Sequence, residues 1–217
     1  MRAAIVLTVF LGTAAVLSSQ ERPRVAEEIP PRFGIPHRGK TYSQATPKLA
    51  LESVLAVAER GDTKYLVAHL LDPVFVDTRI ADRGKQFEPT VLEELNRLKD
   101  FQKRNPDQGS SDSLIPTDPV KFQARLVADS RLRAFNQLTG DVKAKLIDDP
   151  EVLKDLRRFA RSGSFPEGGG DTAKVGLPDV KDRAVFLKKI GDRWYMENRQ
   201  TDEKAPSPPA SPEPKKE

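Results

Sequence analysis

The stretch "KKIGDRWYMENR", residues 188–199, decides the architecture predicted for the C-terminal part of the chain. It contains Trp194, the only tryptophan of the sequence. Two strand-like runs meet here, "RAVFLKKI" at 183–190 and "RWYMENR" at 193–199. Gly191-Asp192 separates the two runs and is a two-residue signal for a tight turn between antiparallel strands. The stretch therefore predicts a β-hairpin.

The expected register divides the side chains of this hairpin between two faces, because alternate residues of a strand point to opposite sides. Leu187 lies opposite Met196, and Lys189 opposite Trp194. Leu187, Met196 and Trp194, together with Val185, then form a face that is typical of a protein core. Phe186 and Tyr195 share the other face, where they could line a shallow ligand pocket or sit under a helix.

A two-stranded ribbon is not stable by itself, so helices must pack on this hairpin and further strands are expected to pair with it. Two short segments are the candidate strands. The run "VFVDTRI", 74–80, has the β-branched and aromatic composition of a strand. A short piece near "AKVGL", 173–177, is the second candidate, within a glycine-rich segment, 164–179, otherwise expected to be a loop.

Helices are predicted for most of the remaining chain. Thr46 can cap a first helix that has Pro47 at its first position and ends at Gly61, and Asp62 can cap a second that ends at Asp72-Pro73. Further helices are expected at 89–105, 119–138, 139–149 and 149–163, and a loop at 106–119. The predicted fold class is α+β, with helices packed on a small antiparallel sheet.

The two ends of the chain differ in composition from this single predicted domain, 46–200. Residues 1–19 have the pattern of a secretory signal peptide, whose apolar run of about 22 Å is short of the roughly 30 Å membrane core. A retained anchor is the alternative. Residues 20–45 are proline-rich and predicted to be a linker, and 201–217 are predicted to be a disordered tail. The expected localisation is secreted or periplasmic, without a stable membrane span after signal cleavage.

Composition limits the possible chemistry. The chain has no cysteine, so its domain must be stable without disulfides. The net charge of +4 comes from interspersed charges of both signs, and no basic block alternates with aromatic residues, so no nucleic-acid partner is predicted. No phosphate-binding loop, zinc-ligand spacing or calcium loop is present, and we predict neither a metal site nor a cofactor.

Three segments in this order, "TPKLALESVLAVAERGD" (46–62), "LLDPVFVD" (70–77) and "KIGDRWYMEN" (189–198), resemble the NTF2-like superfamily, also called cystatin-like or SnoaL-like. The resemblance implies helices folded against a curved antiparallel sheet, a pocket between sheet and helices, and a possible homodimer through the open sheet face. The middle of the chain departs from the family pattern, because helices are predicted where members carry successive strands.

Enzymes of this superfamily use a carboxylate base and an oxyanion donor in an apolar cavity. Asp77 and Tyr65 are the candidates for such a pair, and His69 shares a helix face with Tyr65. His37 lies in the predicted linker. No pair can be assigned from the sequence, so we predict no catalytic residue and take Tyr65, His69, Phe186 and Tyr195 as candidate ligand-binding residues.

Three functions stay open at this point. The first is a non-enzymatic envelope protein that binds a small molecule or another envelope protein. The second is an NTF2-like enzyme with an acid–base pair between sheet and helices. The third is an interaction protein that acts through its helical middle and its tail.

Overall fold

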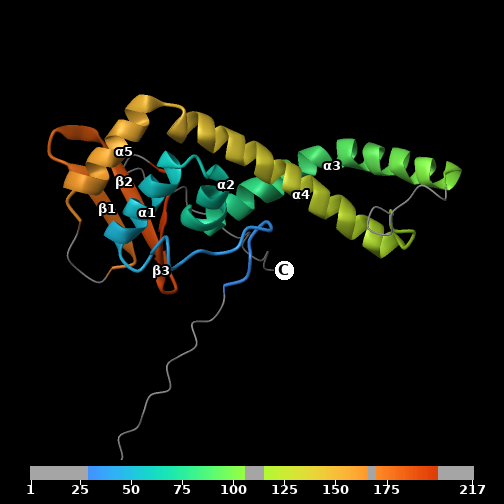
Figure 1. Cartoon of the computed structure of the whole chain (residues 1–217), viewed down its shortest axis with the longest axis horizontal. Helices are drawn as coiled ribbons and strands as arrows, with labels where there is room; N and C mark the ends of the chain where they lie inside the picture. The colour runs from blue at the N-terminus through green and yellow to red at the C-terminus, as the bar shows by residue number, and fades with distance from the viewer. Residues whose placement is uncertain (1–28, 106–114, 166–169, 200–217) are drawn as a thin grey trace, which may run out of the picture.

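The computed structural model describes residues 29–105, 115–165 and 170–199 (Figure 1). The described part is an α+β fold, in which helices pack on a three-stranded antiparallel sheet. The predicted signal segment 1–19, the predicted tail 201–217 and most of the predicted loop 106–119 lie outside the described residues. None of the described helices is both long enough and apolar enough to cross a membrane.

The first two helices form as the sequence predicts. In α1, Pro47–Glu59, the Thr46 hydroxyl accepts a hydrogen bond from the Leu49 N–H at 3.2 Å, and Gly61 follows in the left-handed region at φ +69°. The Asp62 carboxylate caps α2, Thr63–Tyr65, which continues as the π-helical turn η1, Leu66–Leu70.

The predicted strand at 74–80 is wrong. This segment opens α3, Pro73–Arg104, a helix of 32 residues that also includes the predicted helix at 89–105. The Asp72 carboxylate accepts a hydrogen bond from the Val74 N–H at 2.9 Å, and Pro73 occupies the first turn. The buried positions Val76 and Ile80 are four residues apart, which is helical spacing. Capping and periodicity therefore outweigh the β-branched composition.

The next helix, α4, Pro119–Val142, begins at Asp118 as predicted, but the separate helix expected at 139–149 does not form. Instead α4 runs directly into a second π-helical turn, η4, Lys143–Ile147. The last helix, α5, Pro150–Ser162, forms within the predicted range 149–163; the Asp149 side chain caps it and Gly163 follows its last residue.

The outer parts of α3 and α4 project from the body as a helical arm, which we define as residues 87–104 and 119–130 (Figure 1). The arm has its own small core, and Phe87 packs against both this core and the main one. The arm core consists of Val91, Leu95 and Leu126 together with Ile115, which precedes α4.

The sheet consists of β1, Thr172–Leu177, β2, Val180–Ile190, and β3, Arg193–Met196, in the order β1-β2-β3. The predicted hairpin register is confirmed: Leu187 pairs with Met196 and Lys189 with Trp194, around Gly191 at φ +60°. The candidate strand at 173–177 is also confirmed, so the loop expected at 164–179 contains a strand.

The main core lies between one face of this sheet and the helices. Leu187 and Trp194 are buried in it, and Val185 and Met196 pack against it, as the predicted register requires. Helices α1 and α5 contact both each other and the sheet. The assignment of this hairpin face to the core is therefore confirmed.

Residues 29–45, which we call the N-terminal strap, lie against this body, although they belong to the segment predicted as a linker. Phe33 stacks on Phe135 with ring centroids 4.5 Å apart, and Tyr42 is buried in the main core. Gln44 is 4% exposed and closes the edge of β3. Its carbonyl accepts from the Trp194 N–H at 2.9 Å, and its side chain donates to the Trp194 carbonyl at 2.8 Å.

Candidate functional site

A cavity of about 330 Å³ lies between the helices and one end of the sheet. This volume is within the range of small-molecule sites. The lining comes from the beginning of α3, the end of α4 with η4, α5, the middle of β2 and the end of β3. Most of its lining side chains are apolar; prominent among them are Phe75, Leu138, Leu146, Leu156, Phe159 and Phe186.

Two local features bring α3 to this end of the sheet. Leu71 forms a parallel bridge with Met196, and the Asp72 N–H donates to the Met196 carbonyl at 2.9 Å. Because α3 begins at the next residue, its first turns start beside the end of β3. Phe75 and Arg79, one helical turn apart, both line the cavity as a result.

The charged lining residues form ion pairs around the apolar part. Arg83 pairs with Asp141 at 2.6 Å and Arg183 with Asp155 at 3.0 Å, and a third pair joins Arg199 to Glu197. The Arg199 guanidinium also lies over the Phe186 ring, 4.1 Å from its centroid. This guanidinium and the apolar side chains enclose Phe186, which makes a cation–π contact.

Two further basic residues of the lining, Arg79 and Lys145, have no ion-pair partner among the described residues. The Arg79 guanidinium lies 5.9 Å from the centroid of the Phe75 ring. The cavity therefore combines an apolar interior with an excess of positive charge, which suits ligands that carry apolar and anionic parts.

Of the four candidate ligand-binding residues, only Phe186 lines this cavity. Tyr195 lies on the predicted face of the hairpin with Phe186, but it is 3% exposed and the Arg193 guanidinium covers its ring at 5.3 Å. Burial raises the pKa of Tyr195, so its hydroxyl is neutral at neutral pH.

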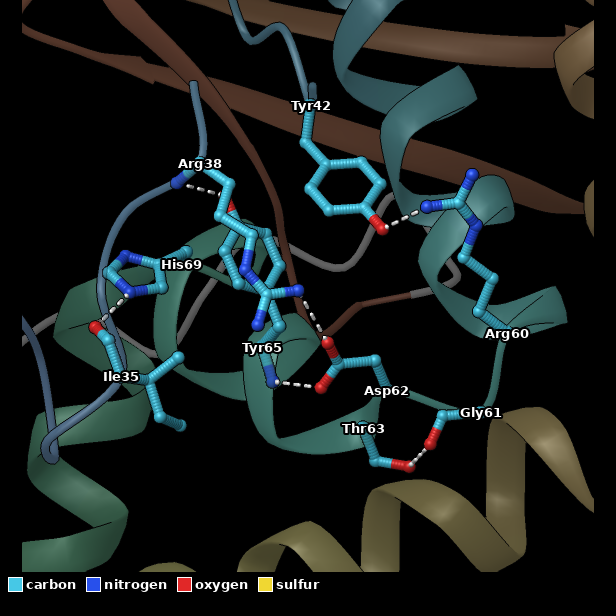
Figure 2. A network of polar contacts seen from close by, with 9 residues as sticks. All are labelled: Ile35, Arg38, Tyr42, Arg60, Gly61, Asp62, Thr63, Tyr65 and His69. Carbon is cyan, nitrogen blue, oxygen red and sulfur yellow. Dashed lines mark hydrogen bonds and ion pairs between the residues drawn. The ribbon is translucent and has the colours of Figure 1, made fainter. Parts of the chain in front are cut away.

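Tyr65 and His69 lie under the N-terminal strap in a network of polar contacts (Figure 2). The Tyr65 hydroxyl accepts a hydrogen bond from the Arg38 N–H at 3.1 Å. His69 Nε2 lies 2.8 Å from the Ile35 carbonyl oxygen, so this nitrogen carries the proton and donates it. Asp62 accepts from the Tyr65 N–H and pairs with Arg38, both at 3.2 Å.

Burial favours the neutral forms of His69, His37 and Tyr65 in this part of the fold. Burial is the main cause that lowers the pKa of His69; the hydrogen bond to Ile35 opposes it, and the charges of His37, Arg32 and Arg193 lower it further. Burial also lowers the pKa of His37 and raises that of Tyr65. With 1% of its surface exposed, His69 has no open path to a substrate and joins the strap to the body.

Asp77 has a different set of partners. It lies on α3, not on a strand, and pairs at 2.6 Å with Arg32, which also donates to the Ala68 carbonyl at 2.9 Å. Asp77 and Tyr65 thus each bind a part of the strap. Both contacts fasten the strap to the helices, and neither residue lines the cavity.

Sequence reasoning missed Phe75, Arg79 and Lys145 as site residues. The first two fell in the segment predicted as a strand, although the Asp72-Pro73 start and the four-residue spacing are helical signals. Lys145 lies in η4, which only the tertiary structure brings to the cavity.

Comparisons with protein-family models, with curated proteins and with solved structures find no match for this chain. The described residues contain no cluster of three or more His, Asp or Glu side chains arranged to hold a metal ion.

Proposed function

We propose that this protein is a non-enzymatic ligand-binding domain of the cell envelope, with an apolar small molecule bound in the cavity between the sheet end and α3, α4 and α5. The observation that carries the proposal is the cavity itself, which has the volume and the apolar lining of a small-molecule site. Export follows from the signal-like segment 1–19.

The position of the cavity between sheet and helices also agrees with the NTF2-like resemblance, which remains part of the proposal. In this interpretation the α3–α4 helices take the place of the middle strands of the family. The binding function is preferred over the enzymatic one because Tyr65, His69 and Asp77 are engaged in contacts that hold the strap.

The proposal is tested with a neutral apolar fluorophore, N-phenyl-1-naphthylamine, titrated against the purified full-length chain. We expect saturable binding of one probe per chain. Ala184 lies in β2 and lines the cavity, so Ala184→Trp should fill the space and abolish binding. Ala124→Trp on the exposed side of α4 is the matched control and should bind normally. Equal binding by wild type and a folded Ala184→Trp variant would contradict the proposal.

A second candidate function is partner binding through the helical arm. Phe101 is 53% exposed and Val120 78% exposed, and both belong to the arm. Apolar residues at such exposure favour a protein contact, either with an envelope protein or with a second copy of the chain. Light scattering separates these cases, because the substitution Phe101→Glu lowers the measured mass only if the arm forms a homodimer.

A further inference from the structure

We infer that the cavity binds an anionic amphiphile, an apolar chain with one negatively charged head group, and that Arg79 and Lys145 hold this head group. The inference rests on the proposed function and specifies its ligand class. It follows from the charges of the lining and from the way in which α3 and α4 pack.

The first step is the pairing of the lining charges. The acidic residues of the lining are Asp141, Asp155 and Glu197, and each is paired with a lining arginine. The two charges within each of these pairs neutralise each other. Arg79 and Lys145 are the basic residues of the lining that remain without an acidic partner among the described residues, so the site carries a net positive charge.

The second step is the position of these two residues. Arg83 on α3 pairs with Asp141 on α4 at 2.6 Å, and both residues line the cavity, so this ion pair joins the two helices at the site. Arg79 lies one turn before Arg83, and Lys145 lies about one turn after Asp141. Arg79 and Lys145 therefore lie on the two elements that this ion pair joins, and both line the same cavity.

The third step is the effect of these two charges on a ligand. Two positive charges that line one cavity favour an anionic ligand there. A guanidinium also binds a carboxylate through two parallel hydrogen bonds, whereas an ammonium acts as a point charge. Both residues are exposed, so they lie where the cavity meets solvent. The head group would stay at the mouth and the chain would enter the apolar interior.

The interior selects against a small polar anion. Phe75, Leu138, Leu146 and Phe159 line it and offer no hydrogen-bonding side chain. An inorganic anion would leave this surface uncovered, whereas an alkyl chain would bury it, which favours binding in proportion to the apolar area covered. The combination of lining and charge therefore fits an alkyl carboxylate.

The test compares two competitors of equal chain length, dodecanoate and dodecanol, in displacing N-phenyl-1-naphthylamine at about pH 7.5, where the carboxyl group is ionised. We expect dodecanoate to compete at a concentration about 10-fold lower than dodecanol, the ratio for about one charge-assisted hydrogen bond. The double variant Arg79→Gln/Lys145→Gln should bring the two competitors within about 2-fold. Lys121→Gln, an exposed charge on the arm, is the matched control and should keep the preference.

The outcomes separate this inference from the proposed function. Probe binding by the double variant shows that it is folded and that its cavity is intact. Equal competition by both amphiphiles on the wild-type chain overturns the inference and leaves the binding function in place. A preference for dodecanoate that survives in the double variant also overturns the inference and leaves the binding function in place. Absence of probe binding by the wild-type chain overturns both.

Discussion

Gln44 in the N-terminal strap makes hydrogen bonds that a side chain of similar shape cannot replace. We expect its replacement by such a side chain to lower the free energy of unfolding. Its side-chain Nε2 donates to two carbonyls, that of Trp194 at 2.8 Å and that of His69 at 3.0 Å. Gln44→Met keeps the length of the side chain and removes both donors. The backbone hydrogen bond from the Trp194 N–H to the Gln44 carbonyl stays available to the variant.

The expected loss follows from the two carbonyls that the variant leaves without this donor. A buried polar group without a partner costs about 1–3 kcal/mol, so two such groups cost about 2–6 kcal/mol. One effect offsets part of this cost. The Gln44 Oε1 atom is itself buried without a hydrogen bond among the described residues, and methionine removes it. We therefore expect the free energy of unfolding to fall by about 2–4 kcal/mol.

Urea denaturation followed by tryptophan fluorescence measures this loss directly, because Trp194 is the only tryptophan and pairs with Gln44. With an m-value of about 2 kcal/mol per molar, the urea midpoint should fall by about 1–2 M at an unchanged m-value. Gln123→Met on the exposed side of α4 is the control and should leave the midpoint in place. A Gln44→Met midpoint within about 0.3 M of the wild type would refute the reasoning.

Two further predictions concern the strap histidines and the arm. The pKa values of His37 and His69 are lowered in the fold, so the unfolded chain takes up protons first as the pH falls below about 6.5, and stability is lost there. The free energy of unfolding, measured by urea denaturation at about pH 7.5 and 5.5, should fall by at most about 1.4 kcal/mol per pH unit for each histidine, and a flat profile would contradict the assignment. Leu95→Ala should destabilise the arm by about 2–4 kcal/mol, because Leu95 is buried in the arm core. Hydrogen exchange should then speed up in the arm but not in the sheet, and uniform acceleration would show that arm and body unfold together.

Local signals predicted the elements that depend on neighbouring residues alone. Gly191-Asp192 sets both the turn and the register of the last hairpin, and Asp118 and Asp149 start helices by capping. The strand predicted at 74–80 is wrong because composition and position disagree there. The β-branched residues favour a strand, while the Asp72-Pro73 cap and the burial of Val76 and Ile80 favour a helix. There the helix cap and the helical spacing of the buried residues outweighed the β-branched composition.

The strap and the cavity depend on contacts between distant parts of the chain. Proline content made residues 20–45 resemble a linker, and sparse anchors such as Phe33 and Gln44 have no periodicity that would reveal their burial. The cavity draws on α3, η4 and β2, and its lining residues in α3 and β2, such as Phe75 and Phe186, lie more than 100 positions apart. Phe186 could be identified beforehand as a possible pocket residue because the hairpin register alone placed it away from the core face.

The contact between Gln44 and Trp194 spans 150 positions of the chain and also governs the order in which the molecule can be completed. A chain that emerges from its N-terminus exposes the strap first, but the strand whose edge it closes is the last described element to appear. Closing so long a loop is slow compared with forming a local helical hairpin. The Gln44 end of the strap should therefore remain accessible until β3 appears, and any factor that handles the nascent N-terminus has that whole interval in which to act on it.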